Sequence, residues 1–206
     1  SMAIPINIED LLNKRKIESN RIEFKKGWNP DKIYRTICAF ANDFDNIGGG
    51  YIVVGIEEEE RTGIAKRPVT GVPIEALNDI QKDMVGYNNK IEPYYMPRID
   101  VQEVDGKSVL VIWAPAGVNR PYNVRERVTA KQSPSKWYIR SGTSTIEAKG
   151  EVLDELREMA NRTPFDERGN ERIEISDISP ALVLDYLQTV GSRLANDFES
   201  KPFVEI

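Results

Sequence analysis

The sequence predicts an α/β (α+β) fold, in which a mixed β-sheet is flanked by helices and followed by a C-terminal helical extension. Three observations lead to this fold class. Short stretches with strand periodicity alternate with amphipathic stretches of helical spacing. The run Tyr51–Ile56 is almost wholly apolar, as in a central strand buried on both faces. Asp105-Gly106 lies between two strand-like stretches and is typical of a two-residue hairpin turn.

The first half of the chain predicts helix, strand, helix and strand in turn. Asn7 can cap a short helix over Glu9–Lys16. Arg21–Lys26 alternates polar and apolar residues, which predicts a strand. A second helix begins at Pro30 and ends near Phe44. Its apolar stripe consists of Ile33, Ile37, Phe40, Ala41 and Phe44.

The second half adds another helix and a hairpin. Apolar residues at helical spacing predict a helix over Ile74–Tyr87. The stretches Arg98–Val104 and Lys107–Trp113 are the two strands of the predicted hairpin. Residues 114–135 are polar and rich in proline, so we expect irregular structure there.

A strand and two helices complete the expected order. Trp137–Arg140 predicts a strand. Ser144, with Glu147 three residues later, matches a capping box at the start of a helix. A last helix is expected after Ser179-Pro180. Residues 1–162 are therefore interpreted as one domain, and residues 163–206 as a linker and helix that begin a downstream region.

Composition narrows the function classes. The chain has 206 residues, of which 30% are charged, and no apolar run has the roughly 18 residues of a membrane span. Cys38 is the single cysteine, so no internal disulfide can form, and it is expected to be a small core residue. No basic-then-apolar leader is seen, and we expect a cytoplasmic protein without a membrane partner.

Histidine is absent from the chain. Its absence excludes Ser-His and Cys-His nucleophilic catalysis and metal sites that use imidazole. Any catalysis would depend on carboxylates, lysines, tyrosines or a hard metal ion held by oxygen atoms.

Charge is unevenly distributed. Residues 147–206 contain fourteen acids and seven Lys or Arg, whereas residues 1–146 carry a balance of +2. Residues 117–140 hold six cations against Glu126 alone. Such a segment favours a polyanionic partner, and Tyr122, Trp137 and Tyr138 within it could stack on bases. A mobile charged loop beside core aromatics remains the alternative.

Two further patterns concern phosphate binding and metal binding. Gly48-Gly49-Gly50 precedes a strand, whereas phosphate-binding loops follow a strand and open a helix, so a turn is the better interpretation. The acids around the first and central strands could converge to bind Mg²⁺ or Mn²⁺. The alternative is that Glu23 pairs with a neighbouring cation and that Glu57–Glu60 is a solvated turn.

Several motifs together resemble the Schlafen-type Alba-like domain, also called the divergent AAA domain. The motifs are Glu18-x4-Glu23-Phe-Lys25, Ala39-Phe-Ala-Asn42, Gly49-Gly50-Tyr-Ile-Val-Val-Gly55-Ile56, Val109-Leu-Val-Ile-Trp-Ala-Pro115, Asn119-Arg-Pro-Tyr122 and Trp137-Tyr-Ile-Arg140-Ser-Gly142-Thr-Ser-Thr145. The resemblance implies binding of DNA or RNA, and in bacteria a place at the front of proteins classed as transcriptional regulators.

The resemblance also implies an alternative function, because some family members cleave structured RNA with three acids. The first two match Glu18 and Glu23, and the third falls at Glu58, where the family usually has Asp. The loop between Asn42 and Gly49 is longer here than in the family. A cofactor, Mg²⁺ or Mn²⁺, is expected only under this nuclease alternative.

The sequence thus predicts a nucleic-acid-binding domain of a bacterial transcriptional regulator, with no catalytic residue assigned. Eight cations are expected to hold phosphates: Lys25, Lys26, Arg120, Arg125, Arg127, Lys131, Lys136 and Arg140. The rival to both functions is a plain interaction module, in which the acidic tail docks on the basic segment or on a second copy as a homodimer.

Overall fold

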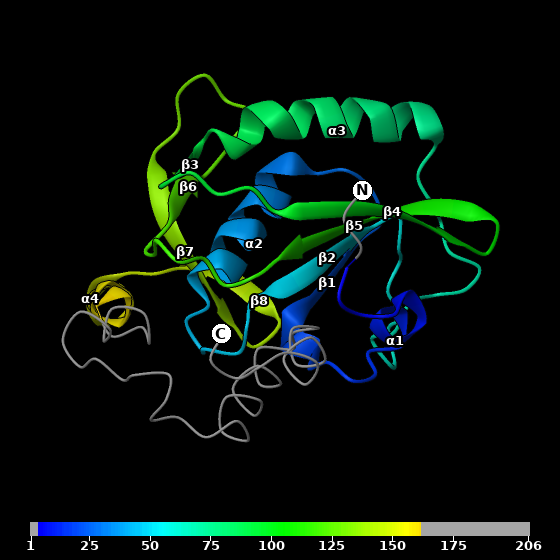
Figure 1. The fold of residues 1–206 in the computed structure, drawn as a ribbon, viewed down its shortest axis with the longest axis horizontal. Coiled ribbons are helices and arrows are strands. Elements are labelled where there is room, and N and C mark those ends of the chain that lie inside the picture. The colour runs from blue at the N-terminus through cyan, green and yellow to red at the C-terminus, as the bar shows by residue number, and fades with distance from the viewer. Residues whose placement is uncertain (1–3, 162–206) are drawn as a thin grey trace, which may run out of the picture.

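The computed structural model describes residues 4–161, which form two four-stranded sheets and four α-helices (Figure 1). In the first sheet the order is β1-β2-β5-β4, with β1 Ile22–Lys25, β2 Gly50–Val54, β4 Arg98–Val104 and β5 Lys107–Ala114. In the second the order is β3-β6-β7-β8, with β3 Ile91–Glu92, β6 Asn123–Arg125, β7 Ser135–Ser141 and β8 Ser144–Glu147. The helices are α1 Ile8–Leu12, α2 Pro30–Asn42, α3 Ile74–Asn88 and α4 Gly150–Ala160.

The predicted fold class is confirmed. Strand β1 pairs with β2 in parallel, whereas β2 with β5 and β5 with β4 are antiparallel, so the first sheet is mixed. Among the described residues, no helix is long and apolar enough to cross a membrane. The predicted linker and last helix lie outside the described residues.

Helix α2 packs between the two sheets (Figure 1). Its buried Ile37 lies in one apolar cluster with Ile52 of β2 and with Tyr138 of β7. Helix α3 adds Leu77 and Met84 to the same cluster. The main core therefore depends on α2, and burial of this cluster joins the two sheets into one unit.

The other face of the first sheet carries a second core. Because side chains alternate along a strand, Tyr51 and Val53 point away from α2. They pack with Leu11 and Leu12 of α1 and with residues of the loop after β2. All five residues of β2 are buried, as predicted for a central strand.

Local signals explain the ends of α2. The Asn29 side chain caps the helix by accepting from the N–H of Lys32 at 3.4 Å, and Pro30 occupies the first turn. The helix ends at Asn42, and the capping residue Asp43 that follows has a φ of 44°, in the left-handed region. The predicted β4–β5 hairpin is also confirmed, since Asp105 and Gly106 both have positive φ.

Two local predictions were wrong or incomplete. Ser144–Glu147 forms strand β8, not a helix start, and α4 begins at Gly150. The β-branched Thr145 and Ile146 favour a strand, and Gly142 has the positive φ needed for the tight turn from β7. Strands β3 and β6 were not predicted, because each is too short to show a periodic pattern.

Candidate nucleic-acid interface

The β6–β7 loop, residues 126–134, is held against the helices by charged side chains. Asp31 of α2 accepts hydrogen bonds from the backbone N–H of Thr129 at 3.0 Å and from its hydroxyl. Arg35 of α2 and Lys90, two residues after α3, donate to backbone carbonyls of the loop. The loop is therefore fixed in place beside the first turn of α2.

Exposed cations gather around that turn. We call Lys26, Lys32, Arg127 and Lys131 the α2 N-terminal surface. Lys26 and Arg127 each have 67% of the side chain exposed, and Lys32 and Lys131 are also exposed. Arg127 lies 3.8 Å from Asp31. The N-terminal end of a helix carries about +0.5 charge from its aligned peptide dipoles, which adds to these side chains.

Chain connectivity limits how far Lys26 can lie from the first turn of α2. Lys26 and Asp31 are five residues apart, so their Cα atoms are separated by at most about 18 Å. Lys32 was not predicted as a site residue. The sequence signal for it is its place on the polar face of an amphipathic helix, next to the capping Asn29.

Arg140, a predicted phosphate ligand, is instead buried, with 7% of the side chain exposed. Its guanidinium donates to the backbone oxygen of Asn20 at 3.2 Å and to the hydroxyl of Thr145 at 3.0 Å. It lies 3.7 Å from Glu23 and 4.9 Å from the ring centre of Phe40. Burial lowers the pKa of Arg140. The structure thus gives Arg140 a role in holding β7, η1 (Ser19–Arg21) and β1 together.

The guanidinium groups of Arg120 and Arg125 donate hydrogen bonds to backbone carbonyls. Arg120 donates to the carbonyls of Asn42 and Asp43, at 3.2 and 3.3 Å, and so satisfies the C-terminal end of α2. Arg125 donates to two carbonyls of the β6–β7 loop at 3.4 Å. Both side chains are half-buried, and their bonds shape the loops that carry the exposed cations.

Lys25 and Lys136 are paired with carboxylates. Lys25 lies 3.9 Å from Glu23, and both are about one-fifth exposed. Lys136 lies 3.3 Å from Glu126 and 3.4 Å from Glu147, and Glu126 is the main cause of its raised pKa. Of the eight predicted cations, the structure therefore brings Lys26, Arg127 and Lys131 to the α2 N-terminal surface and uses the others mainly for internal contacts.

The three acids of the metal alternative do not come together. Since β1 and β2 are parallel, Glu18 before β1 and Glu58 after β2 lie toward opposite ends of the strand pair. Glu58 pairs with Lys14 at 2.9 Å, while Glu23 faces Arg140. Within residues 4–161, no group of three or more His, Cys, Asp or Glu could hold a metal ion.

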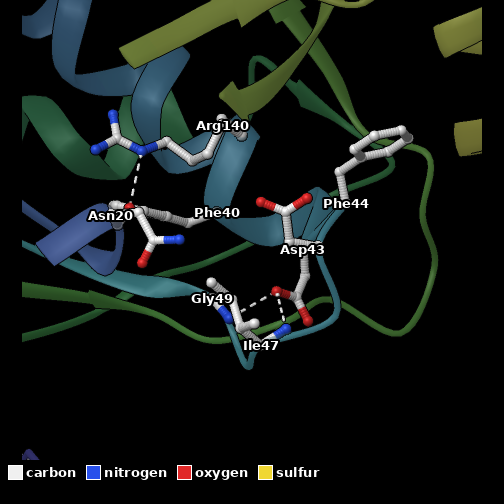
Figure 2. Close-up of a pocket in the computed structure, with 9 residues that line it drawn as sticks. Asn20, Phe40, Asp43, Phe44, Ile47, Gly49 and Arg140 are labelled. Carbon is white, nitrogen blue, oxygen red and sulfur yellow. Dashed lines mark hydrogen bonds between the residues drawn. The ribbon is translucent and has the colours of Figure 1, made fainter. Parts of the chain in front are cut away.

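The glycine run forms a turn around one of the chain's own carboxylates. Asp43 accepts hydrogen bonds from the N–H groups of Ile47, Gly48 and Gly49 at 3.0 to 3.1 Å. Figure 2 shows the bonds from Ile47 and Gly49. Arg21 donates to the carbonyls of Gly48 and Gly49 from the other side. The predicted turn is confirmed, and its anion-binding N–H groups are already occupied.

A shallow pocket lies beside this turn (Figure 2). It is lined by Asn20, Ala39, Phe40, Asp43, Phe44, Asp45, Ile47, Gly49 and Arg140. Two buried atoms of the lining residues, Nη2 of Arg140 and Oδ1 of Asn20, have no protein partner. Buried polar atoms normally have a hydrogen-bond partner. A water molecule in the pocket is the kind of partner that satisfies such atoms.

Comparison with known proteins places the chain in a family. Among solved structures, the N-terminal domain of a RecG-related protein from Nitrosomonas europaea is 26% identical, with a TM-score of 0.47 over 69% of this chain and 92% of that one. The DIP2311 protein from Corynebacterium diphtheriae is 19% identical, with a TM-score of 0.49 over 88% of this chain and 38% of that one. A comparison with curated protein sequences gave no match. The sequence profile of one family matches residues 18–149, which is more than half of the chain, and the chain therefore belongs to the Schlafen, AlbA_2 family.

Proposed function

We propose that this domain binds nucleic acid through the α2 N-terminal surface. The observation that carries the proposal is the group of four exposed cations at the positive end of a 13-residue helix. Phosphate groups are favoured there both by the side chains and by the helix dipole. Membership of the Schlafen, AlbA_2 family supports the proposal.

The surface cations can exchange their present contacts for phosphates at little cost. Arg127 lies 3.8 Å from Asp31, and Lys26 lies 4.0 Å from Glu57. Exposed ion pairs of this kind contribute only about 0–1 kcal/mol. Lys131 makes no ion pair with any carboxylate of residues 4–161, and the same holds for Lys32. These four side chains are therefore free to bind a polyanion without leaving a buried charge unpaired.

Salt dependence of binding tests this proposal. Fluorescence anisotropy with a labelled duplex at several salt concentrations gives the slope of log affinity against log salt. Each phosphate neutralised contributes about 0.9 to that slope for duplex DNA. Lys131→Ala and Arg127→Ala are each expected to weaken binding and to reduce the slope by about 0.9.

Arg15→Ala is the matched control. Arg15 follows α1, has 63% of its side chain exposed and lies 3.5 Å from Asp10, and α1 packs on the face of the first sheet opposite α2. This variant should bind with the parent's affinity and slope. Absence of binding to every DNA and RNA probe at low salt would overturn the proposal. Equal slopes for the parent and both surface variants would show that the phosphates bind elsewhere.

We further propose that the domain serves a bacterial transcriptional regulator, the role implied by the family resemblance. Such a role requires preference for particular duplex sequences and not only phosphate contacts. Repeated selection from a random duplex library is expected to enrich a common sequence. Uniform recovery of the library would leave non-specific nucleic-acid binding as the function.

A further inference from the structure

Two neighbouring loops connect the first sheet to the second and are firmly held. They are residues 93–97, between β3 and β4, and residues 115–122, between β5 and β6 (Figure 1). The hydroxyl of Tyr95 in the first loop donates to the carbonyl of Pro115 in the second at 2.6 Å. The rings of Tyr95 and Tyr122 meet edge to face, with centres 5.4 Å apart. These two contacts join the loops to each other.

The same loops present large apolar side chains to solvent. Tyr94 is 59% exposed, Met96 is 49% exposed, and Val118 in the second loop is 77% exposed. Tyr95, between the first two, is buried. Tyr94 and Met96 thus both face solvent on either side of a buried residue.

The chemistry around these side chains favours an anionic partner with apolar faces. Neither loop contains Asp or Glu, although the exposed Glu92 directly precedes the first loop. Arg98 directly follows the first loop, and Arg120 in the second is half-buried and donates to carbonyls at the end of α2. An exposed aromatic ring with cations nearby in the chain is typical of surfaces on which unpaired bases stack.

Tyr94 follows β3, the strand that connects α3 to the first loop and pairs with β6. At the end of α3, the rings of Tyr34 and Tyr87 meet edge to face with centres 5.5 Å apart. The Tyr34 hydroxyl donates to Oδ1 of Asn88 at the end of α3 at 2.6 Å. Lys90, two residues further on, donates to the carbonyl of Val128 in the β6–β7 loop.

We propose that Tyr94 and Met96 form a stacking surface for unpaired bases of single-stranded DNA or RNA. The inference rests on the proposed nucleic-acid binding and specifies the form of nucleic acid. A base has an apolar face of the size of one side chain, so two neighbouring side chains suffice. A stable protein interface needs about 800 Å² from each partner, and Tyr94, Met96 and Val118 are the only exposed large apolar side chains of these two loops.

The test compares single-stranded and duplex probes. Oligothymidylate of about twelve nucleotides has no stable pairing and covers the site sizes typical of single-strand binders. Tyr94→Ala is expected to lower its affinity by about fivefold to 150-fold, while affinity for a duplex of equal length is unchanged. The salt slope should be the parent's, because stacking neutralises no phosphate. Tyr94→Phe should keep parental affinity, since the ring is retained.

A matched variant and four outcomes make the test decisive. Ile74→Ala removes a side chain that is 67% exposed at the start of α3, and it should change nothing. Equal affinity of the parent and Tyr94→Ala for oligothymidylate would overturn the stacking surface but leave the proposed function intact. Equal loss on both probes would also overturn it. Parent protein that binds neither probe, nor the RNA counterpart of either, would overturn both proposals. A change of oligomeric state in Tyr94→Ala, seen by light scattering, would assign the surface to a second copy of the chain.

Discussion

Asn42 is expected to be the polar side chain on which the junction between α2 and the second sheet depends. It is fully buried at the last residue of α2. Its amide nitrogen donates to the carbonyls of Tyr122 at 3.0 Å and Tyr138 at 2.7 Å, and its oxygen accepts from the N–H of Tyr122 at 2.7 Å. The register that pairs Asn123 with Trp137 sets Tyr122 opposite Tyr138, one step beyond the last paired residues of β6 and β7. Asn42 therefore continues the strand ladder where the two strands separate.

The loss of unfolding free energy in Asn42→Ala can be worked out from the buried backbone groups that lose their hydrogen-bond partner. The Tyr122 carbonyl keeps the thiol of Cys38 as a donor, but the N–H of Tyr122 and the carbonyl of Tyr138 each lose the bond to Asn42. An unsatisfied buried group costs about 1–3 kcal/mol, so the variant should lose about 2–6 kcal/mol of unfolding free energy. Whole domains of this kind are stable by only about 5–15 kcal/mol.

Urea unfolding followed by tryptophan fluorescence measures this loss. With a slope of about 1–3 kcal/mol per molar, the midpoint should fall by about 1 M or more. Asn119→Ala is the matched control, because that side chain is exposed, and its effect should stay within about 0.5 kcal/mol. If Asn42→Ala also unfolds within about 0.5 kcal/mol of the parent, water or a shifted backbone must replace the amide, and the reasoning fails.

Three further predictions concern acid stability, thiol reactivity and glycine positions. Bonds from Arg67 lower the pKa of Asp105 from 3.8 to about 2, so this carboxylate stabilises the fold above pH 4 and loses its effect as the pH falls toward 2. The midpoint difference between the parent and Asp105→Asn should accordingly be largest near pH 7 and vanish near pH 2, and a constant difference would contradict this. Burial raises the pKa of Cys38 to about 12, so the native thiol should react with a thiol reagent only after unfolding, and rapid labelling of folded protein would refute its placement. Gly49→Ala should destabilise strongly, because the new Cβ would lie 2.1 Å from a backbone oxygen of β5, whereas Gly86→Ala in α3 meets no atom within 4 Å and should stabilise by up to about 1 kcal/mol. Equal midpoints in urea for these two variants would be inconsistent with the structure.

Much of the fold could be predicted from local patterns. The proline at the first helical position and the apolar stripe together predicted α2 nearly to its ends, whereas the Asn29 cap was recognised only in the structure. The unbroken apolar run predicted β2, and Asp105-Gly106 predicted the β4–β5 hairpin. These signals lie within a few residues of one another, so the sequence contains them directly. The same locality explains the error at Ser144–Glu147, where a capping pattern and a strand pattern overlap and only pairing with β7 decides between them.

The candidate site was less predictable, because exposure of a cation depends on distant residues. Arg140 and Lys131 are equally basic in the sequence, yet Arg140 bonds Asn20, 120 residues away, and Lys131 stays exposed. The parallel direction of β1 and β2, which separates Glu18 from Glu58, leaves no local trace either.

The sequence by itself determined the family, the order of the main elements and the absence of imidazole chemistry, since each rests on residue type and short-range spacing. Only the tertiary structure decided which charges face solvent, which acids stay apart, and that Tyr94 and Met96 are exposed beside a buried Tyr95. The physical reason is that burial and ion pairing arise between segments far apart in the chain, and packing of α2 between two sheets is what brings those segments together.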